Sequence, residues 1–252
     1  MSTVLIDGDT IYYRVEYGDH SIEEAKERLD NLVERVIETC FADEVKIAVK
    51  GSGNFRNKVF SEYKANRKRD DRKKARLKEL HQYMCDTHGA IRSDGMEADD
   101  LLRIWAHEAN YEDVIIASID KDLWCIAGTH YLIHKDEFKH VDENEADLHY
   151  WQQVLKGDPV DNIPGLPGIG DKRAATMLEG TTIGQRKQVV VDAYKEIFQD
   201  DWHEKLMETG QLIHILRKPD DFFNIDKEAF SSNTVESPEC EATSEEEGSM
   251  EV

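Results

Sequence analysis

Short groups of aspartates and glutamates recur along this sequence, and such groups can support metal-dependent hydrolysis. They comprise Asp7, Asp9, Glu97, Asp99, Asp100, Asp120, Asp122, Asp158 and Asp161. An acidic first turn of a helix would explain Glu97, Asp99 and Asp100 taken alone. Carboxylates that meet on one rim, however, repel one another unless cations neutralise them. Oxygen ligands favour Mg²⁺ or Mn²⁺, and two such ions about 4 Å apart commonly serve phosphodiester hydrolysis. We therefore predict a two-metal hydrolytic site.

Two further features favour a polyanionic partner. The stretch Arg56–Lys78 carries eleven Lys and Arg residues against three acids, although the whole chain has a net charge of −21. Its predicted nucleic-acid contacts are Arg56, Tyr63, Lys64, Arg67 and Lys68; a solvated loop is the plainer interpretation. Further along, Gly168-Ile169-Gly170 opens a helix that continues with Lys172 and Arg173. Backbone N–H groups there can approach a phosphate closely, although an ordinary Gly/Pro turn would look similar.

The bulk composition limits the class of protein. A chain of 252 residues suits one large domain, or one domain with a small helical appendage. No apolar run approaches the roughly 20 residues of a membrane span, and scattered cysteines favour a reducing cytoplasm. The last 22 residues, Ser231–Val252, hold seven Glu and neither Lys nor Arg, so we expect a disordered tail there.

Alternating strands and helices must position the acidic groups. Apolar runs predict strands at Val4–Ile6, Val45–Val49, Val114–Ile119, Tyr131–His134 and Phe138–Val141. Apolar residues at helical spacing predict helices at Ile22–Phe41, Leu77–His88, Met96–Ala109, Glu145–Lys156, Lys172–Leu178, Gly184–Phe198 and Trp202–Leu216. The stretch Phe55–Arg76 lacks that spacing and is expected to be irregular. Such alternation indicates a mostly parallel sheet, whose carboxyl strand ends gather ligands, and Asp7 and Asp120 fall at such ends.

Five motifs, taken in this order, resemble those of the 5′-nuclease family. That family includes flap endonucleases, the 5′ nuclease domain of bacterial DNA polymerase I and phage 5′–3′ exonucleases. The motifs are Leu5-Ile6-Asp7-Gly8, Tyr63-Lys64-Ala65-Asn66-Arg67, Glu97-Ala98-Asp99-Asp100, Asp120-Lys121-Asp122, and Gly157–Gly165 followed by Gly168-Ile169-Gly170. The match spans residues 3–225, and the combination is highly specific. Within the family, the small size and Gly210–Arg217 most resemble the exonucleases of short-tailed phages.

The resemblance implies an α/β fold of PIN-like, Rossmann-like type, with a mostly parallel sheet flanked by helices. It also implies a helical arch and a C-terminal helix–hairpin–helix subdomain. The expected regions are a nuclease core at 1–157 with its basic arch at about 55–78, a DNA-binding region at 158–230 and the acidic tail at 231–252.

The resemblance also implies roles for single residues. Its metal ligands, for two Mg²⁺ or Mn²⁺ ions, are Asp7, Glu97, Asp99, Asp100, Asp120, Asp122, Asp158 and Asp161. Lys64 and Arg67 would contact the scissile phosphate and act with Asp7 and Asp120 in catalysis. The residues that would hold duplex DNA, together with a K⁺ ion, are Gly168, Ile169, Gly170, Lys172 and Arg173.

One position departs from the family pattern. Members usually carry another Asp shortly after the second strand, where this chain has Val49-Lys50-Gly51-Ser52. Gly51 occupies that slot, so metal binding is expected to be weaker unless Asp9 compensates.

Two other classes explain fewer of these residues. Val4–Thr10 also matches the strand–DxDxT motif of haloacid-dehalogenase-type phosphatases, in which the first Asp is a nucleophile, but that class leaves the basic stretch unexplained. A non-catalytic DNA-binding module would explain Gly168–Arg173 but not the acids. We therefore expect a monomeric, metal-dependent 5′→3′ exodeoxyribonuclease without a membrane partner. It would act in the cytoplasm (that of the host, if a phage encodes it) on 5′ ends of duplex DNA, with flap endonuclease and RNase H-like activity on RNA–DNA hybrids.

Overall fold

A mostly parallel sheet forms the centre of the molecule, for which a computed structural model describes residues 1–18, 20–67 and 71–226. Its strands are β1 (Thr3–Asp7), β2 (Glu44–Lys50), β3 (Ile91–Ser93), β4 (Val114–Ser118), β5 (Gly128–Leu132) and β6 (Glu137–Val141). They lie in the order β3-β2-β1-β4-β5-β6, and β6 alone in this sheet runs antiparallel to its neighbour. The predicted α/β fold with a mostly parallel sheet is confirmed.

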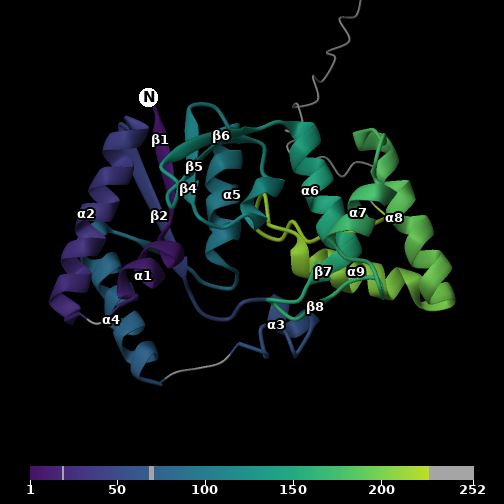
Figure 1. Ribbon diagram of the computed structural model, residues 1–252, viewed down its shortest axis with the longest axis horizontal. Coiled ribbons are helices and arrows are strands. Elements are labelled where there is room, and N and C mark those ends of the chain that lie inside the picture. Colours follow the sequence, from purple (N-terminus) through teal and green to yellow (C-terminus); the bar gives the residue numbers. More distant parts are fainter. Residues whose placement is uncertain (19, 68–70, 227–252) are drawn as a thin grey trace, which may run out of the picture.

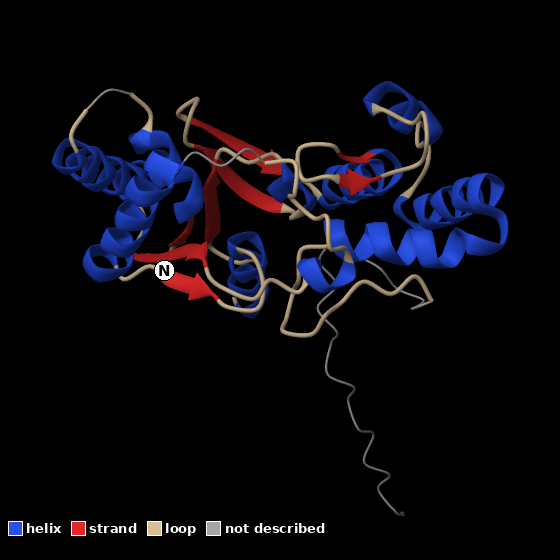
Figure 2. Ribbon diagram, turned by 90° about the horizontal axis from the view of Figure 1, so that it is seen from below, coloured by secondary structure: helices blue, strands red, loops and turns tan. Residues whose placement is uncertain are grey.

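Helices cover both faces of the sheet because side chains of each strand alternate between the faces. Val4 and Ile6 of β1 pack with α1 (Gly8–Glu16), α2 (Ile22–Cys40) and α4 (Asp71–His88). Leu5, between them, packs with α5 (Ala98–Glu108) and α6 (Glu143–Lys156) on the other face. Figure 1 shows α1, α2 and α4 together on one side of the strands, and Figure 2 shows the sheet between helical layers.

A second helical region follows α6 and extends its core. It contains the short hairpin of β7 (Gly157–Asp158) and β8 (Ile163–Pro164), then α7 (Asp171–Met177), α8 (Ile183–Phe198) and α9 (Trp202–Ile213). Trp151 of α6, Tyr194 of α8 and Leu206 of α9 belong to the same buried cluster as Leu5. Figure 1 shows this region beside α6, at the end of the molecule opposite α2. None of the described helices is long and apolar enough to cross a membrane.

Helix α1 begins directly after β1, which the sequence pattern did not predict. Asp7 ends the strand and caps the helix, because its side chain accepts a hydrogen bond from the N–H of Thr10. A Cβ on Gly8 would lie 2.6 Å from Val49 Cγ1 and 2.8 Å from the carbonyl oxygen of Ala48. Only glycine therefore lets α1 pack this closely against β2, and that packing fixes where Asp7 and Asp9 lie.

The basic stretch differs from the sequence prediction in its regularity. It contains the short helix α3 (Arg56–Val59), a series of turns, and then α4, which begins at Asp71 rather than at Leu77. Polar side chains occupy the first turns of α4, so the apolar spacing that marks a helix starts only later in the segment. Lys68 and the predicted disordered tail, Ser231–Val252, lie outside the described residues.

Candidate functional site

Seven of the eight predicted metal ligands line two adjoining pockets of about 410 Å³ each. The first pocket is lined by Asp7, Asp9, Glu97, Asp99 and Asp120, and the second by Glu97, Asp99, Asp120, Asp122, Asp158 and Asp161, among others. Lys64 and Arg67 line both. The acids come from the ends of β1 and β4, the start of α5 and the β7–β8 hairpin. Among the described residues, no group of three or more His, Cys, Asp or Glu side chains is arranged in this structure so that it could hold a metal ion.

Ser118 connects the two acids that follow neighbouring strands. Ser118 Oγ donates to Asp7 Oδ2 at 2.7 Å and accepts from the N–H of Asp120 at 2.9 Å. Asp7 is only 2% exposed. Asp120 lies at the pocket rim, where its Oδ1 accepts from the N–H of Asp122. The orientation of these carboxylates is therefore set by the sheet, as expected for residues at carboxyl strand ends.

The crowded carboxylates hold protons more tightly than isolated ones do. Burial, reinforced by the charge of Asp9, raises the pKa of Asp7 to about 7. Burial and the charges of Asp120, Asp158 and Asp161 raise the pKa of Asp122 to about 7 as well. The site therefore has an excess of negative charge at neutral pH, which a divalent cation would neutralise.

This excess charge predicts a pH dependence of the stability of the metal-free protein. A carboxyl whose pKa is raised on folding makes the folded protein less stable as the pH increases. The loss occurs between the ordinary pKa of the carboxyl, 3.8, and its pKa in the folded protein, about 7. Asn at position 122 cannot titrate, so Asp122→Asn should raise the melting temperature progressively more between about pH 4 and pH 7. Saturating Mg²⁺ should reverse the sign of that difference. A difference that stays constant with pH, as expected for the exposed control Asp113→Asn, would contradict the assignment.

Two cations are ion-paired with these acids. Lys64 Nζ pairs with Glu97 and lies 3.2 Å from Asp161 Oδ2, and Arg67 pairs with Asp161 Oδ1. The carboxylates raise the pKa of Lys64 and Arg67 against the opposing effect of burial. Both predicted catalytic cations thus lie at the acidic pockets.

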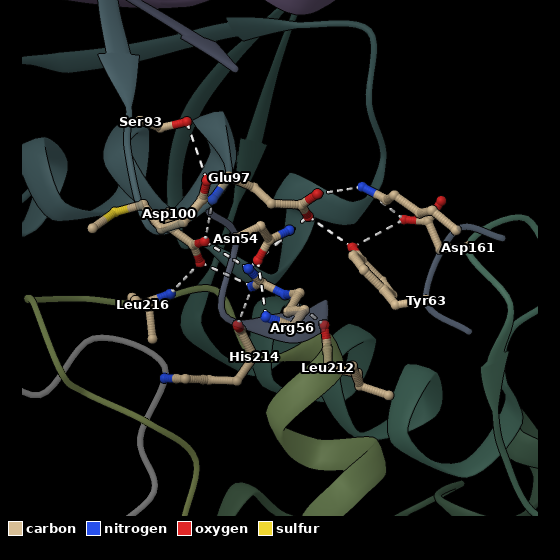
Figure 3. A network of polar contacts seen from close by, with 12 residues as sticks. Asn54, Arg56, Tyr63, Ser93, Glu97, Asp100, Asp161, Leu212, His214 and Leu216 are labelled. Carbon is tan, nitrogen blue, oxygen red and sulfur yellow. Dashed lines mark hydrogen bonds and ion pairs between the residues drawn. The ribbon is translucent and has the colours of Figure 1, made fainter. Parts of the chain in front are cut away.

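The structure corrects the prediction for Asp100, the eighth predicted metal ligand. Asp100 is fully buried, and its oxygens accept from Arg56 at 2.6 and 2.9 Å and from the N–H groups of Glu97 and Leu216. Figure 3 shows this network around Arg56. Asp100 itself lines neither pocket, since its oxygens are bonded to Arg56 and to two backbone N–H groups. The neighbouring guanidinium lowers the pKa of Asp100 despite burial.

Arg56 and Tyr63 also differ from their predicted role in nucleic-acid contact. Arg56 is 2% exposed, and besides Asp100 its guanidinium donates to the carbonyl oxygens of Leu212 and His214. Tyr63 is 5% exposed, and its hydroxyl donates to Glu97 at 2.8 Å (Figure 3). Both side chains line the second pocket but are almost wholly buried, so they support the site from inside the protein.

Gly51 lies where a side chain cannot be accommodated. A Cβ there would lie 2.5 Å from the carbonyl carbon of Ser93 and 2.6 Å from the nitrogen of Asp94. Asp9, from α1, instead reaches this end of β2, where it accepts from the N–H of Lys50 at 2.8 Å. A carboxylate from α1 therefore lies beside the carboxyl end of β2, where the strand itself has none.

The close contact at Gly51 predicts a loss of stability on substitution. Gly51→Ala should lower the free energy of unfolding by about 1–3 kcal/mol, because the added methyl group meets backbone atoms that cannot rotate away. Urea denaturation would measure the change. Gly184→Ala is the matched control, since nothing lies within 4 Å of its Cβ position and alanine favours the helix α8. Equal stability of the two variants would refute the crowding at Gly51.

The predicted phosphate-binding turn lies apart from both pockets. Gly168 has φ of 75°, which favours glycine, and Gly170 caps α7. The side chain of Arg173 donates to the carbonyl oxygen of Gly168, and Lys172 is exposed. The turn follows the β7–β8 hairpin along the chain. Its backbone N–H groups and its cations therefore lie on the segment that comes after Asp161.

Tyr13 and Gln153 are among the residues that line these pockets and that sequence reasoning missed. Tyr13 is 50% exposed, stacks on Tyr12 at 5.1 Å between ring centroids, and lines the first pocket. Gln153 of α6 donates to Asp122 Oδ1 at 2.7 Å in the second. Neither belongs to a charged group in the sequence. The position of Tyr13 two turns after Asp7 in a helix would have been the signal, had α1 been predicted.

Known proteins share this sequence pattern and this fold. Residues 2–151 match the family model described as 5′-3′ exonuclease, N-terminal resolvase-like domain. The DNA polymerase I of Pseudomonas aeruginosa is 30% identical over 149 residues, half of this chain and 15% of that protein; that of Rhizobium leguminosarum is 38% identical over 101 residues, 35% of this chain and 10% of that protein. The chain thus spans a small part of the curated relatives that it matches.

Solved structures share the fold as well. A T5 D15 protein co-crystallised with metal ions has a TM-score of 0.69 at 18% identity, covering 85% of this chain and 89% of that one. A bacteriophage T5 D15 flap endonuclease in a complex with DNA and metal ions has a TM-score of 0.60 at 16% identity, covering 84% and 99%. With the family model matching more than half of its length, this chain belongs to the 5′-3′ exonuclease family through its N-terminal resolvase-like domain.

Proposed function

We propose that this protein is a divalent-metal-dependent 5′→3′ exonuclease that hydrolyses phosphodiester bonds of duplex DNA from 5′ ends. The observation that carries the proposal is the joint lining of two adjoining pockets by eight carboxylates, with Lys64 and Arg67 lining both pockets. Lys64 and Arg67 lie beside these acids, where they can bind the negative charge of a phosphodiester substrate. Related proteins support the choice, since a T5 D15 flap endonuclease was crystallised with DNA and metal ions.

The donor set fits two hard divalent cations. Asp7, Glu97, Asp99 and Asp120 would hold one Mg²⁺ or Mn²⁺, and the ligands of the other would be Asp122, Asp158 and Asp161. When bound, such ions make a bound water acidic and stabilise charge on the phosphate. The raised pKa values of Asp7 and Asp122 agree with this assignment, because burial and neighbouring carboxylates disfavour their charged forms and a bound cation would offset both effects.

The chain's own residues would orient the substrate. Lys64 and Arg67 would bind the scissile phosphate and stabilise its developing charge. Tyr13 offers a half-exposed ring on which a base can stack. The turn at Gly168–Arg173, with a K⁺ ion, would hold the duplex through its phosphates. Flap cleavage and RNase H-like removal of RNA from hybrids are further activities proposed for the same site.

The phosphatase alternative has less support. A phosphatase nucleophile has to reach a small substrate, but the carboxylate of Asp7 is 2% exposed and bonded by Ser118 and Thr10. A binding module without catalysis would not explain the charge imbalance of the pockets.

One experiment separates the three classes of function. The protein is incubated with 5′-labelled duplex, 5′-flap and RNA–DNA hybrid substrates, and with a small phosphomonoester, in Mg²⁺ or in EDTA. We expect metal-dependent release of 5′-terminal products from the nucleic acids. Hydrolysis of the phosphomonoester alone would support a phosphatase, and binding without cleavage would support a module. Either result would overturn the proposal.

A further inference from the structure

The basic turn (Glu62–Arg67) is held against the hairpin loop (Asp158–Asn162) by backbone and side-chain hydrogen bonds. The N–H of Lys64 donates to the carbonyl oxygen of Asp161, Asn66 Nδ2 to that of Pro159, and Asn162 Nδ2 to that of Glu62, each at 2.8 Å. Lys64 and Asn162 both have φ of 58°, an uncommon conformation for residues with a side chain. The two segments therefore form a specific contact and do not simply lie near each other.

The charged groups of this contact are the same groups to which the proposed function assigns metal binding and phosphate binding. The ammonium group of Lys64 lies between Glu97 and Asp161, and Arg67 pairs with the other oxygen of Asp161. Glu97 and Asp161 are 19% and 12% exposed, so the pairs are partly shielded from water. The hydroxyl of Tyr63 also donates to Glu97 from inside the protein (Figure 3). The cation that these two carboxylates now bind is thus part of the chain itself.

We propose that Lys64 and Arg67 compete with divalent metal for Glu97 and Asp161, and that bound metal displaces both cations and releases the basic turn from the hairpin loop. This inference rests on the proposed function, in which Glu97 and Asp161 bind metal and the two cations bind phosphate. The same oxygens cannot satisfy a lysine and a metal ion equally well, so the two compete. Loading of metal would then deliver both cations to the substrate.

Competition predicts that loss of Lys64 strengthens metal binding. Lys64→Ala, measured by calorimetry with Mg²⁺ and without DNA, should lower the dissociation constant about five- to tenfold. Lys121→Ala is the matched control. Lys121 lines the same pocket, but its ammonium group lies over the ring of Trp124 and makes no ion pair within the described residues. An equal change in both variants would overturn the proposal, because it would mean that loss of any positive charge near the pocket has the same effect. Weaker metal binding by Lys64→Ala would overturn it as well.

Release of the basic turn can be observed directly in the unmodified protein. Hydrogen exchange of the Lys64 amide, which donates to Asp161, should become about tenfold faster when Mg²⁺ is added. Asn66→Ala should speed the same exchange without metal, since it removes one docking bond and no carboxylate. Unchanged or slower exchange in saturating Mg²⁺ would overturn the inference. If calorimetry shows Mg²⁺ binding in that case, the metal site itself still stands; if no Mg²⁺ binds and no nucleic acid is cut, the proposed function fails as well.

Discussion

Asp120→Asn is expected to slow cleavage of 5′-labelled duplex DNA by about 10³-fold or more and to leave DNA binding nearly unchanged. Asp120 lines both pockets and so is placed to contact either metal. Asparagine keeps the size of the side chain and can still accept from the N–H of Asp122. What it loses is charge, and metal-based stabilisation of a transition state amounts to several kcal/mol, where about 1.4 kcal/mol corresponds to a tenfold change in rate.

The measurement compares single-turnover cleavage with DNA affinity in the same buffer. Asp113→Asn is the control, because Asp113 precedes β4 whereas Asp120 follows it, and its side chain is 74% exposed at the opposite end of that strand. Asp113→Asn should cleave at the normal rate. If Asp120→Asn retained more than about a tenth of the activity, Asp120 would not be a metal ligand.

Topology explains why the sequence located part of this site so well. Parallel strands end at the same edge of a sheet, so an acid after β1 and another after β4 must lie close together. The two strands are direct neighbours, with Ile6 opposite Ala117. Buried strands such as Val114–Ser118 have a strong apolar pattern, and the predicted positions of Asp7 and Asp120 followed from that pattern alone.

The first turn of α5 shows where such reasoning fails. Asp99 and Asp100 are adjacent and chemically identical, yet Asp99 lines the pockets and Asp100 is buried beside Arg56. The difference depends on Arg56, 44 residues earlier, and on Leu216, 116 residues later. No local pattern encodes contacts at such separations, and the same is true of Tyr63, whose aromatic ring turns inward while Lys64 faces the acids.

Helix α1 was missed for a related reason. Its nine residues carry both apolar and polar side chains, and the run Asp7-Gly8-Asp9 is typical of a loop. The glycine is required by the close approach of α1 to Ala48 and Val49, which is a tertiary contact. Local propensity therefore favoured a turn, whereas packing against β2 favoured a helix.

Asp100→Ala is expected to destabilise the protein by about 3–5 kcal/mol, because it leaves the guanidinium of Arg56 buried without its counter-charge. Urea denaturation should show a lower midpoint with an unchanged slope. Asp171→Ala is the control: Asp171 pairs with Lys156, but its side chain is 85% exposed, and such surface pairs contribute about 1 kcal/mol or less. A loss for Asp100→Ala no larger than that of the control would contradict the role assigned to the buried pair.

Replacement of both partners should not restore this stability, although apolar residues often replace a buried ion pair without loss. Arg56 also donates to the carbonyl oxygens of Leu212 and His214, and Asp100 accepts from the N–H groups of Glu97 and Leu216. An apolar pair such as Arg56→Met with Asp100→Leu would leave four backbone groups without these partners, each at a cost of about 1–3 kcal/mol if it stays buried. The double variant should therefore be at least as unstable as Asp100→Ala. Recovery to normal stability would mean that these backbone contacts contribute little, and that apolar packing alone can hold the segment after α9 against the start of α5.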